Sequence, residues 1–106
     1  MSRVELSAAA SGDLKRLYEF LAQFDLGVAD NANDAIATGL AYLAVNPTSG
    51  SLLEDRPNTR KYVVDFGASG YLIFHKYFEK TDVTFVARII HQKEWYDAQK
   101  MSVGFR

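Results

Sequence analysis

The chain has 106 residues, of which 48% are apolar and 24% are charged, as is usual for one soluble globular domain, here residues 1–106. Its formal net charge of −1 argues against a protein that coats nucleic acid, and the absence of cysteine excludes disulfides and thiolate chemistry. We find neither a leader nor an apolar run near the ~20 residues that span a bilayer, and therefore expect a cytoplasmic protein with no membrane partner.

The N-terminal half favours one short strand and two helices. Arg3–Leu6 alternates apolar and polar residues, as a half-buried strand does. Ser7 or Ser11 can cap the helix that follows, whose apolar stripe runs over Leu14–Phe24. A second helix is expected from about Val28 to Val45, because its apolar residues recur at helical spacing. The link between these two helices is short, which predicts that they form an antiparallel helical hairpin.

The C-terminal half favours a sheet. Pro47–Thr59 is rich in Ser, Pro, Asn and Gly, which indicates a loop. Three apolar runs follow with short links, at Arg60–Phe66, Tyr71–Phe78 and Val83–His91, and they predict an antiparallel meander. The whole order predicts an α+β fold: a short N-terminal strand, then a two-helix hairpin packed on a three-strand meander.

The middle strand of this meander is apolar on both faces. One face carries Tyr71, Ile73, His75 and Tyr77, and the other carries Leu72, Phe74, Lys76 and Phe78. The helical hairpin can cover only one of them. We therefore expect the second face to need a partner. We expect His75 to lie either in the core or in a groove on that second face.

Several cationic and aromatic residues near the sheet are candidates for contacting a target. They are Arg60, Arg88, His91, Lys93, Trp95 and Tyr96. A local basic patch could also include Lys100 and Arg106. The alternatives are structural: Arg60 and Arg88 could pair with Asp65, Glu79 or Asp82, His91 could simply end the sheet, and the two aromatic residues could cap the core. Two histidines without cysteine give no recognisable metal site, and we expect no cofactor.

The order and spacing of these elements resemble the RelE/ParE superfamily of bacterial toxins. The resemblance covers Val4 to about Ala98. The features that carry it are Leu6-Ser7 before an Ala-rich turn and Asp13-Leu14, Asn46-Pro47 with the Gly-containing loop and Arg60, Tyr71 before an apolar strand, and the run Arg88–Tyr96. It implies the toxin component of a type II toxin–antitoxin, plasmid-stabilisation-type system.

The RelE branch of this superfamily cleaves messenger RNA on the ribosome with cations that stabilise charge building on phosphate. Laid along this chain, its lysine positions fall on Val63 and Asp65 and one arginine falls on Leu72. Another arginine falls at or beside Gln92, with Lys93 as the nearest cation. A carboxylate where phosphate should bind is repulsive. We therefore expect no catalytic residues and no cleavage.

The ParE branch fits better, because Ile89–Glu94 resembles its closing pattern of an apolar strand, a histidine and a cation two residues later. This resemblance implies a non-enzymatic toxin that inhibits a macromolecular target such as DNA gyrase. It also implies a cognate, ParD-like, DNA-binding antitoxin that forms a hetero-oligomer with the toxin. The alternatives are a RelE-type, ribosome-dependent endoribonuclease and a non-toxic remnant that only binds the antitoxin.

The free apolar face of the sheet is our expected antitoxin groove. A disordered antitoxin segment would cover it with an amphipathic helix and add a strand to an open edge. The expected apolar contacts are Leu72 or Ile73, according to which face the hairpin takes, together with Phe74 and Phe78. Arg60 and Arg88 would meet acidic residues of the antitoxin.

Overall fold

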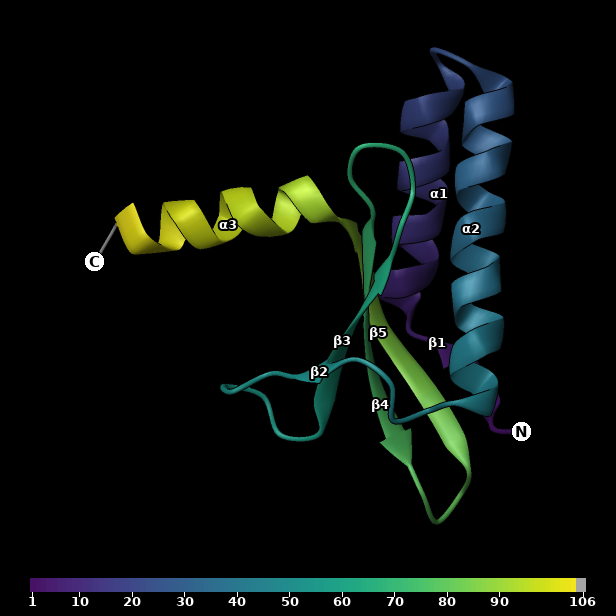
Figure 1. Ribbon diagram of the computed structural model, residues 1–106, viewed down its shortest axis with the longest axis vertical. Helices are drawn as coiled ribbons and strands as arrows, with labels where there is room; N and C mark the ends of the chain where they lie inside the picture. Colours follow the sequence, from purple (N-terminus) through teal and green to yellow (C-terminus); the bar gives the residue numbers. More distant parts are fainter. Residues whose placement is uncertain (105–106) are drawn as a thin grey trace.

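The computed structural model describes the backbone of residues 1–104 and the side chains of residues 1–98, so the expected basic residues Lys100 and Arg106 lie outside the described side chains. The elements follow one another as β1 (Arg3–Leu6), α1 (Ala8–Ala22), α2 (Leu26–Val45), β2 (Ser51–Leu52), β3 (Thr59–Val64), β4 (Tyr71–Phe78), β5 (Val83–His91) and α3 (Gln92–Gly104). The expected α+β fold is confirmed (Figure 1).

Both helices of the hairpin begin at a side-chain cap. The Ser7 hydroxyl accepts a hydrogen bond from the Ala10 N–H at 2.9 Å, so Ser7 rather than Ser11 starts α1. Asp25 Oδ1 accepts from the Val28 N–H at 3.1 Å and starts α2. Each cap satisfies a backbone donor that the helix itself leaves unpaired. The two helices then run side by side along one face of the sheet (Figure 1).

The five strands form one sheet in the order β1-β5-β4-β3-β2. The meander β3–β4–β5 is antiparallel, as expected, and β1 joins it parallel to β5. Two elements were not expected. The two-residue strand β2 pairs with β3 inside the segment interpreted as a loop. The segment that carries Trp95 and Tyr96 forms the helix α3, which projects from the body (Figure 1).

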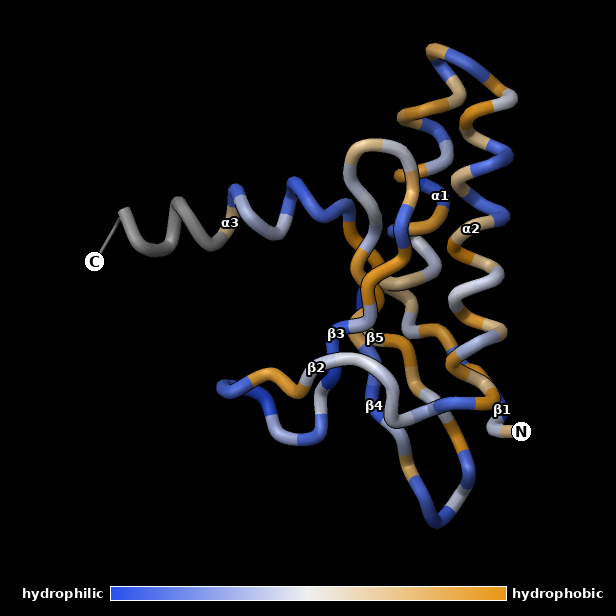
Figure 2. Tube along the Cα trace, viewed as in Figure 1, coloured by the Kyte–Doolittle hydropathy of each residue, from blue (hydrophilic) through white to orange (hydrophobic). Residues whose placement is uncertain are grey.

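The hydrophobic core lies between the helices and one face of the sheet, called here the inner face. Its buried members are Ala10, Leu17, Ala32, Ile36, Leu43, Val64, Tyr71, Ile73, Val86 and Ile89. Figure 2 shows apolar and polar residues alternating along both helices, as amphipathic helices require. Gly39 brings α2 close to the sheet, because a Cβ there would lie 2.7 Å from Val64 Cγ2. Gly39 is therefore required for close packing of α2 on the sheet.

A bulge shifts the register of β5 against β4. Phe74 pairs with Arg88 and His75 with Val86, which leaves Ala87 as an extra residue in β5. The Ser7 hydroxyl donates to the Ala87 carbonyl at 2.6 Å, so the residue that caps α1 also fixes the bulge. Beyond this point β1 has ended and α1 lies against β5. This arrangement decides where Arg88 and His91 lie.

Candidate functional site

His91 ends β5 and caps the first turn of α3. Its Nδ1 accepts a hydrogen bond from the Lys93 N–H at 3.1 Å, and its own N–H donates to Glu94 Oε1 at 2.8 Å. The ring packs edge-on against Tyr71, with 5.4 Å between the ring centroids. His91 therefore has the structural role of a helix cap, while Lys93 beside it is exposed.

The aromatic residues Trp95 and Tyr96 separate in the structure. Trp95 packs on Phe74 with 5.1 Å between ring centroids, and Lys61 Nζ lies 5.5 Å from its ring. Phe74 and Lys61 pair across β4 and β3 on the sheet face away from the helices, called here the outer face. Tyr96 is 60% exposed. Trp95 thus covers part of the outer face, and Tyr96 is available to another molecule.

Arg88 reaches α1 and forms the main ion pair of this region. Its Nε lies 2.7 Å from Asp13 Oδ2 and its Nη2 lies 2.9 Å from Asp13 Oδ1. The same carboxylate accepts the Ile89 N–H at 2.9 Å. The partner is therefore Asp13, and none of the three acids expected from the sequence. This bidentate pair commits one of the expected target-binding cations to the fold.

Asp13 is a buried carboxylate at the free part of the β5 edge. Burial alone would raise the pKa of Asp13, but the hydrogen bonds from Arg88 and the Ile89 N–H, with the charges of Arg88 and Arg16, lower it. The same pair raises the pKa of Arg88. Asp13 therefore stays ionised at neutral pH.

Arg60 lies away from His91. It pairs with His75 across the sheet, whereas His91 pairs with Tyr71 at the start of β4. Its Nη1 donates to the Gly50 carbonyl at 3.2 Å. The six expected target-binding residues therefore do not form one patch. His91, Lys93 and Tyr96 lie together at α3, while Arg60, Arg88 and Trp95 contact other parts of the chain.

A groove of about 780 Å³ opens beside His91. It lies between α1, the loop that joins β3 to β4, and the start of α3. Its lining residues are Arg16, Leu17, Phe20, Leu21, Phe66, Gly67, Ala68, Ser69, Tyr71, His91, Lys93, Glu94 and Asp97. Arg16 bridges its two walls, since Nη1 lies 3.0 Å from Glu94 Oε2. Sequence reasoning missed the α1 wall. The residue that could have indicated this wall is Phe20, an aromatic residue on the polar side of α1. Its side chain is 60% exposed.

The expected antitoxin residues lie on two different faces. Ile73 is fully buried against the helices, so Leu72 is the residue that belongs to the outer face. Leu72 and Phe74 point outward but are themselves buried, Phe74 beneath Trp95. Phe78, at the far end of β4, is 50% exposed. The outer face is therefore less open than its composition indicates, because Trp95 at the start of α3 covers Phe74.

His75 is fully buried on the inner face. Its Nε2 lies 3.0 Å from the Ser49 carbonyl, and its Nδ1 has no hydrogen-bond partner. Burial lowers the pKa of His75, and the charge of Arg60 adds to this, although the hydrogen bond to Ser49 opposes it. His75 is therefore neutral at pH 7 and has a structural role.

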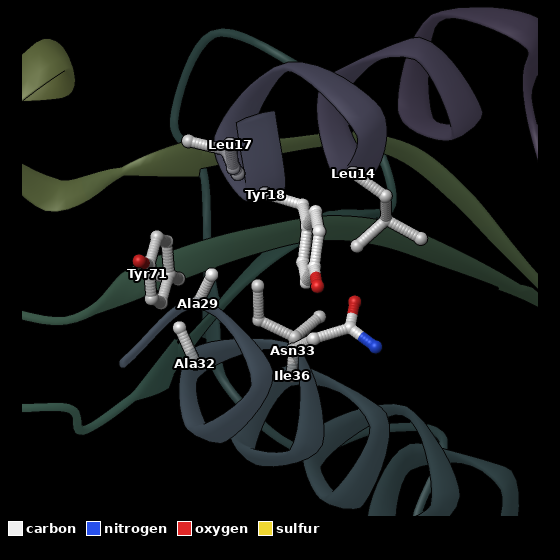
Figure 3. A pocket seen from close by; sticks show the side chains of 8 residues that line it. All are labelled: Leu14, Leu17, Tyr18, Ala29, Ala32, Asn33, Ile36 and Tyr71. Carbon is white, nitrogen blue, oxygen red and sulfur yellow. The ribbon is translucent and has the colours of Figure 1, made fainter. Parts of the chain in front are cut away.

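The gap between α1 and α2 is too small for a ligand. It measures about 10 Å³ and is lined by Leu14, Leu17, Tyr18, Ala29, Ala32, Asn33, Ile36 and Tyr71 (Figure 3). A space of this size holds at most one water molecule. Among the described residues, no group of three or more His, Cys, Asp and Glu side chains could hold a metal ion. Nor does that part of the chain contain a helix with the length and apolarity needed to cross a membrane.

Comparison with known proteins identifies the family. The family profile described as the ParE toxin of the type II toxin–antitoxin system parDE matches residues 4–96. No curated protein sequence matches the chain. The fold is similar to that of the chromosomal ParDE toxin–antitoxin system from P. aeruginosa, with a TM-score of 0.67 and 15% identity over 86% of this chain and 96% of that one.

Two further solved structures share the fold. The intact E. coli RelBE toxin–antitoxin complex gives a TM-score of 0.62 and 14% identity over 85% of this chain and 95% of that one. The RelBE2 toxin–antitoxin complex from Mycobacterium tuberculosis gives a TM-score of 0.57 and 15% identity over 86% of this chain and 98% of that one. These structures support the fold, and the profile supplies the family: the chain belongs to the ParE toxin family of type II toxin–antitoxin systems.

Proposed function

We propose that this family member is a non-enzymatic toxin of the ParE type. It would bind and inhibit a macromolecular target such as DNA gyrase in the cytoplasm, and a cognate ParD-like antitoxin would neutralise it. The observation that carries this proposal is the chemistry of the outer face and its border. The positions at which RelE-type nucleases carry cations are occupied here by Val63, Asp65 and Leu72, of which Leu72 is 1% exposed.

Three nearby ionisable groups, Arg88, Lys61 and His91, support the same proposal, because each makes contacts within the chain. Arg88 is bound by Asp13 through two hydrogen bonds, and Lys61 lies over Trp95. His91 Nδ1 accepts a backbone N–H and is not free as a general base. A charge that builds on phosphate at the outer face would find a carboxylate, Asp65, and few free donors.

For the target, the surface best suited is the groove beside His91. It combines an apolar floor with a polar rim, which includes Lys93, and Tyr96 is exposed on the same helix turn. Exposed aromatic residues and a mixed polar rim are common in protein interfaces. A protein target therefore fits this surface better than a small substrate.

The antitoxin surface that we propose is the outer face between Val63 and Phe78. The outward positions of β3, β4 and β5 include the cations Lys61, Lys76 and Arg88, and the carboxylate Asp65 follows directly after the end of β3. An amphipathic helix with acidic and apolar residues complements such a face. Phe78, being exposed, is the best anchor, and the short edge strand β2 offers backbone groups for an added strand.

A paired assay tests the proposed activity. The purified protein is added to DNA supercoiling by gyrase and, separately, to messenger RNA bound on translating ribosomes. We expect inhibition of supercoiling, its relief by the antitoxin, and intact messenger. Cuts in the ribosomal A site that disappear in Lys93→Ala or His91→Ala would contradict the proposal and support the nuclease alternative. Inactivity in both assays, with the antitoxin still bound, would support a non-toxic remnant.

The antitoxin surface has its own test. Phe78→Asp places a charge at an exposed position, so the fold should persist, and the affinity for the antitoxin should fall more than tenfold, or by more than ~1.4 kcal/mol. Phe24→Asp is the matched control, because Phe24 is exposed at the tip of the helical hairpin, in the link between α1 and α2. If the affinity for the antitoxin falls equally in both variants, or does not fall in either, the outer face is not the antitoxin surface.

A further inference from the structure

The junction of β5 and α3 is a reciprocal helix cap with a histidine at the capping position. In the usual arrangement a Ser or Thr side chain accepts from the first turn, and a Glu three residues later accepts from the capping residue. Here His91 Nδ1 accepts the Lys93 N–H, and Glu94 Oε1 accepts the His91 N–H. Glu94 also binds Arg16 at 3.0 Å, which ties this turn to α1.

The cap requires one protonation state of the imidazole. Because Nδ1 accepts a hydrogen bond, the ring is neutral and its proton is on Nε2. A second proton can bind only at Nδ1, where it would replace the acceptor by an N–H group facing the Lys93 N–H. The cation would also stand at the positive end of the helix dipole. Protonation is thus incompatible with this cap.

The other groups around His91 only partly compensate a positive charge. From β4 the neutral ring of Tyr71 packs against it. From α1, Arg16 lines the same groove and is positive. From α3 come Lys93, Glu94 and Asp97, and Glu94 is already bound by Arg16 and the His91 N–H. Asp97, one turn along α3, is the remaining carboxylate of the groove.

We infer that the start of α3 is a proton-responsive hinge, whose docking on the sheet is weakened when His91 gains a proton. Release breaks the Lys93–His91 hydrogen bond, moves Trp95 off Phe74 and removes one wall of the groove. Because the cap needs Nδ1 as a hydrogen-bond acceptor, docking should weaken as the pH falls. The inference concerns the free chain and does not depend on the proposed toxin activity.

Trp95 reports this motion directly, because it is the only tryptophan of the chain. Its fluorescence is measured from pH 8 to pH 5, the range in which histidine side chains titrate, with far-UV circular dichroism to show that the chain stays folded. We expect emission to move to longer wavelength as the pH falls. The ratio of docked to released forms should fall about fivefold, the usual effect of losing one N-cap hydrogen bond.

His91→Ser is the decisive variant, because serine caps helices well and does not titrate. In this variant Trp95 should stay docked across the pH range, whereas His91→Ala should resemble the acidic form at every pH. The buried His75 is present in all three proteins, so any contribution from it persists in the His91→Ser variant. A fluorescence step of the same size in wild type and His91→Ser overturns the inference, as does the absence of a step in wild type.

A second measurement holds even if the variants fold poorly. In the NMR spectrum of the unmodified chain, the Lys93 backbone amide proton should titrate together with the His91 ring and move upfield as its hydrogen bond is lost. An amide shift of Lys93 that stays constant while His91 titrates would also overturn the inference.

Discussion

Asp13→Ala should be among the most destabilising single changes at a polar residue of this chain. The substitution leaves the Ile89 N–H without its acceptor at a buried position, which costs about 1–3 kcal/mol. It also removes the ion pair to Arg88, whose side chain is 51% exposed, so water screens that loss to about 1 kcal/mol. The free energy of unfolding should fall by about 2–4 kcal/mol in total. In a domain of this size the midpoint of thermal unfolding should fall by about 10–20 °C.

Urea denaturation followed by circular dichroism measures this change. Asp13→Asn keeps an oxygen that can accept the Ile89 N–H and should lose about half as much as Asp13→Ala. Asp34→Ala, at an exposed position of α2, is the control and should change stability by less than about 0.5 kcal/mol. If Asp13→Ala costs no more than Asp34→Ala, the carboxylate does not hold α1 to β5 as we have argued.

The pH dependence of Asp13 gives a further check on the same argument. Its pKa is lowered in the folded chain, so its contribution is present above the ordinary carboxylate value of about 3.9. That contribution should be lost as the pH falls through the folded value. The Asp13→Asn variant should therefore lose less stability than the wild type on acidification. Equal acid sensitivity in the two proteins would show that other carboxylates dominate the acid transition.

One change of pH and two substitutions give further tests of how the chain packs. Since the pKa of His75 is lowered, stability should be complete above its ordinary value of about 6.5 and decrease below it, in urea titrations at pH 7.5 and 5.5. Gly39→Leu should destabilise by about 1–3 kcal/mol or more, because a side chain there meets Val64, and a neutral result would contradict the packing. Trp95→Ala should increase binding of a hydrophobic dye to the outer face, whereas Tyr96→Ala, already exposed, should not.

The elements that the sequence predicted are those whose signals are local. The hairpin, the meander and β1 follow from apolar spacing and from turns, so their ends are correct to within a few residues. The first helix begins at Ala8, several residues before the apolar stripe at Leu14, because Ser7 supplies the cap. The strand β2 could not be predicted, since two residues carry no periodicity and pair only once β3 is in place.

The site residues depended on contacts between distant segments. Arg88 could not be assigned to Asp13, because an ion pair across the domain leaves no mark on either local sequence. The helix α3 was not predicted, because residues 92–104 lack a continuous apolar stripe. A local signal was present, however, in the spacing of His91 and Glu94, which matches a capping box once histidine is admitted as the capping residue.

The outer face shows why composition alone overstated the free surface. A strand that is apolar on both sides requires two covers, and the hairpin supplies one of them. The second is partly intramolecular, because Trp95 lies on Phe74 while Phe78 stays exposed. An antitoxin that binds this face therefore competes for, or builds upon, a surface that α3 already shares. On our proposal, the affinity of such a partner should depend on the position of α3 as well as on the strands, because Trp95 occupies part of the proposed surface.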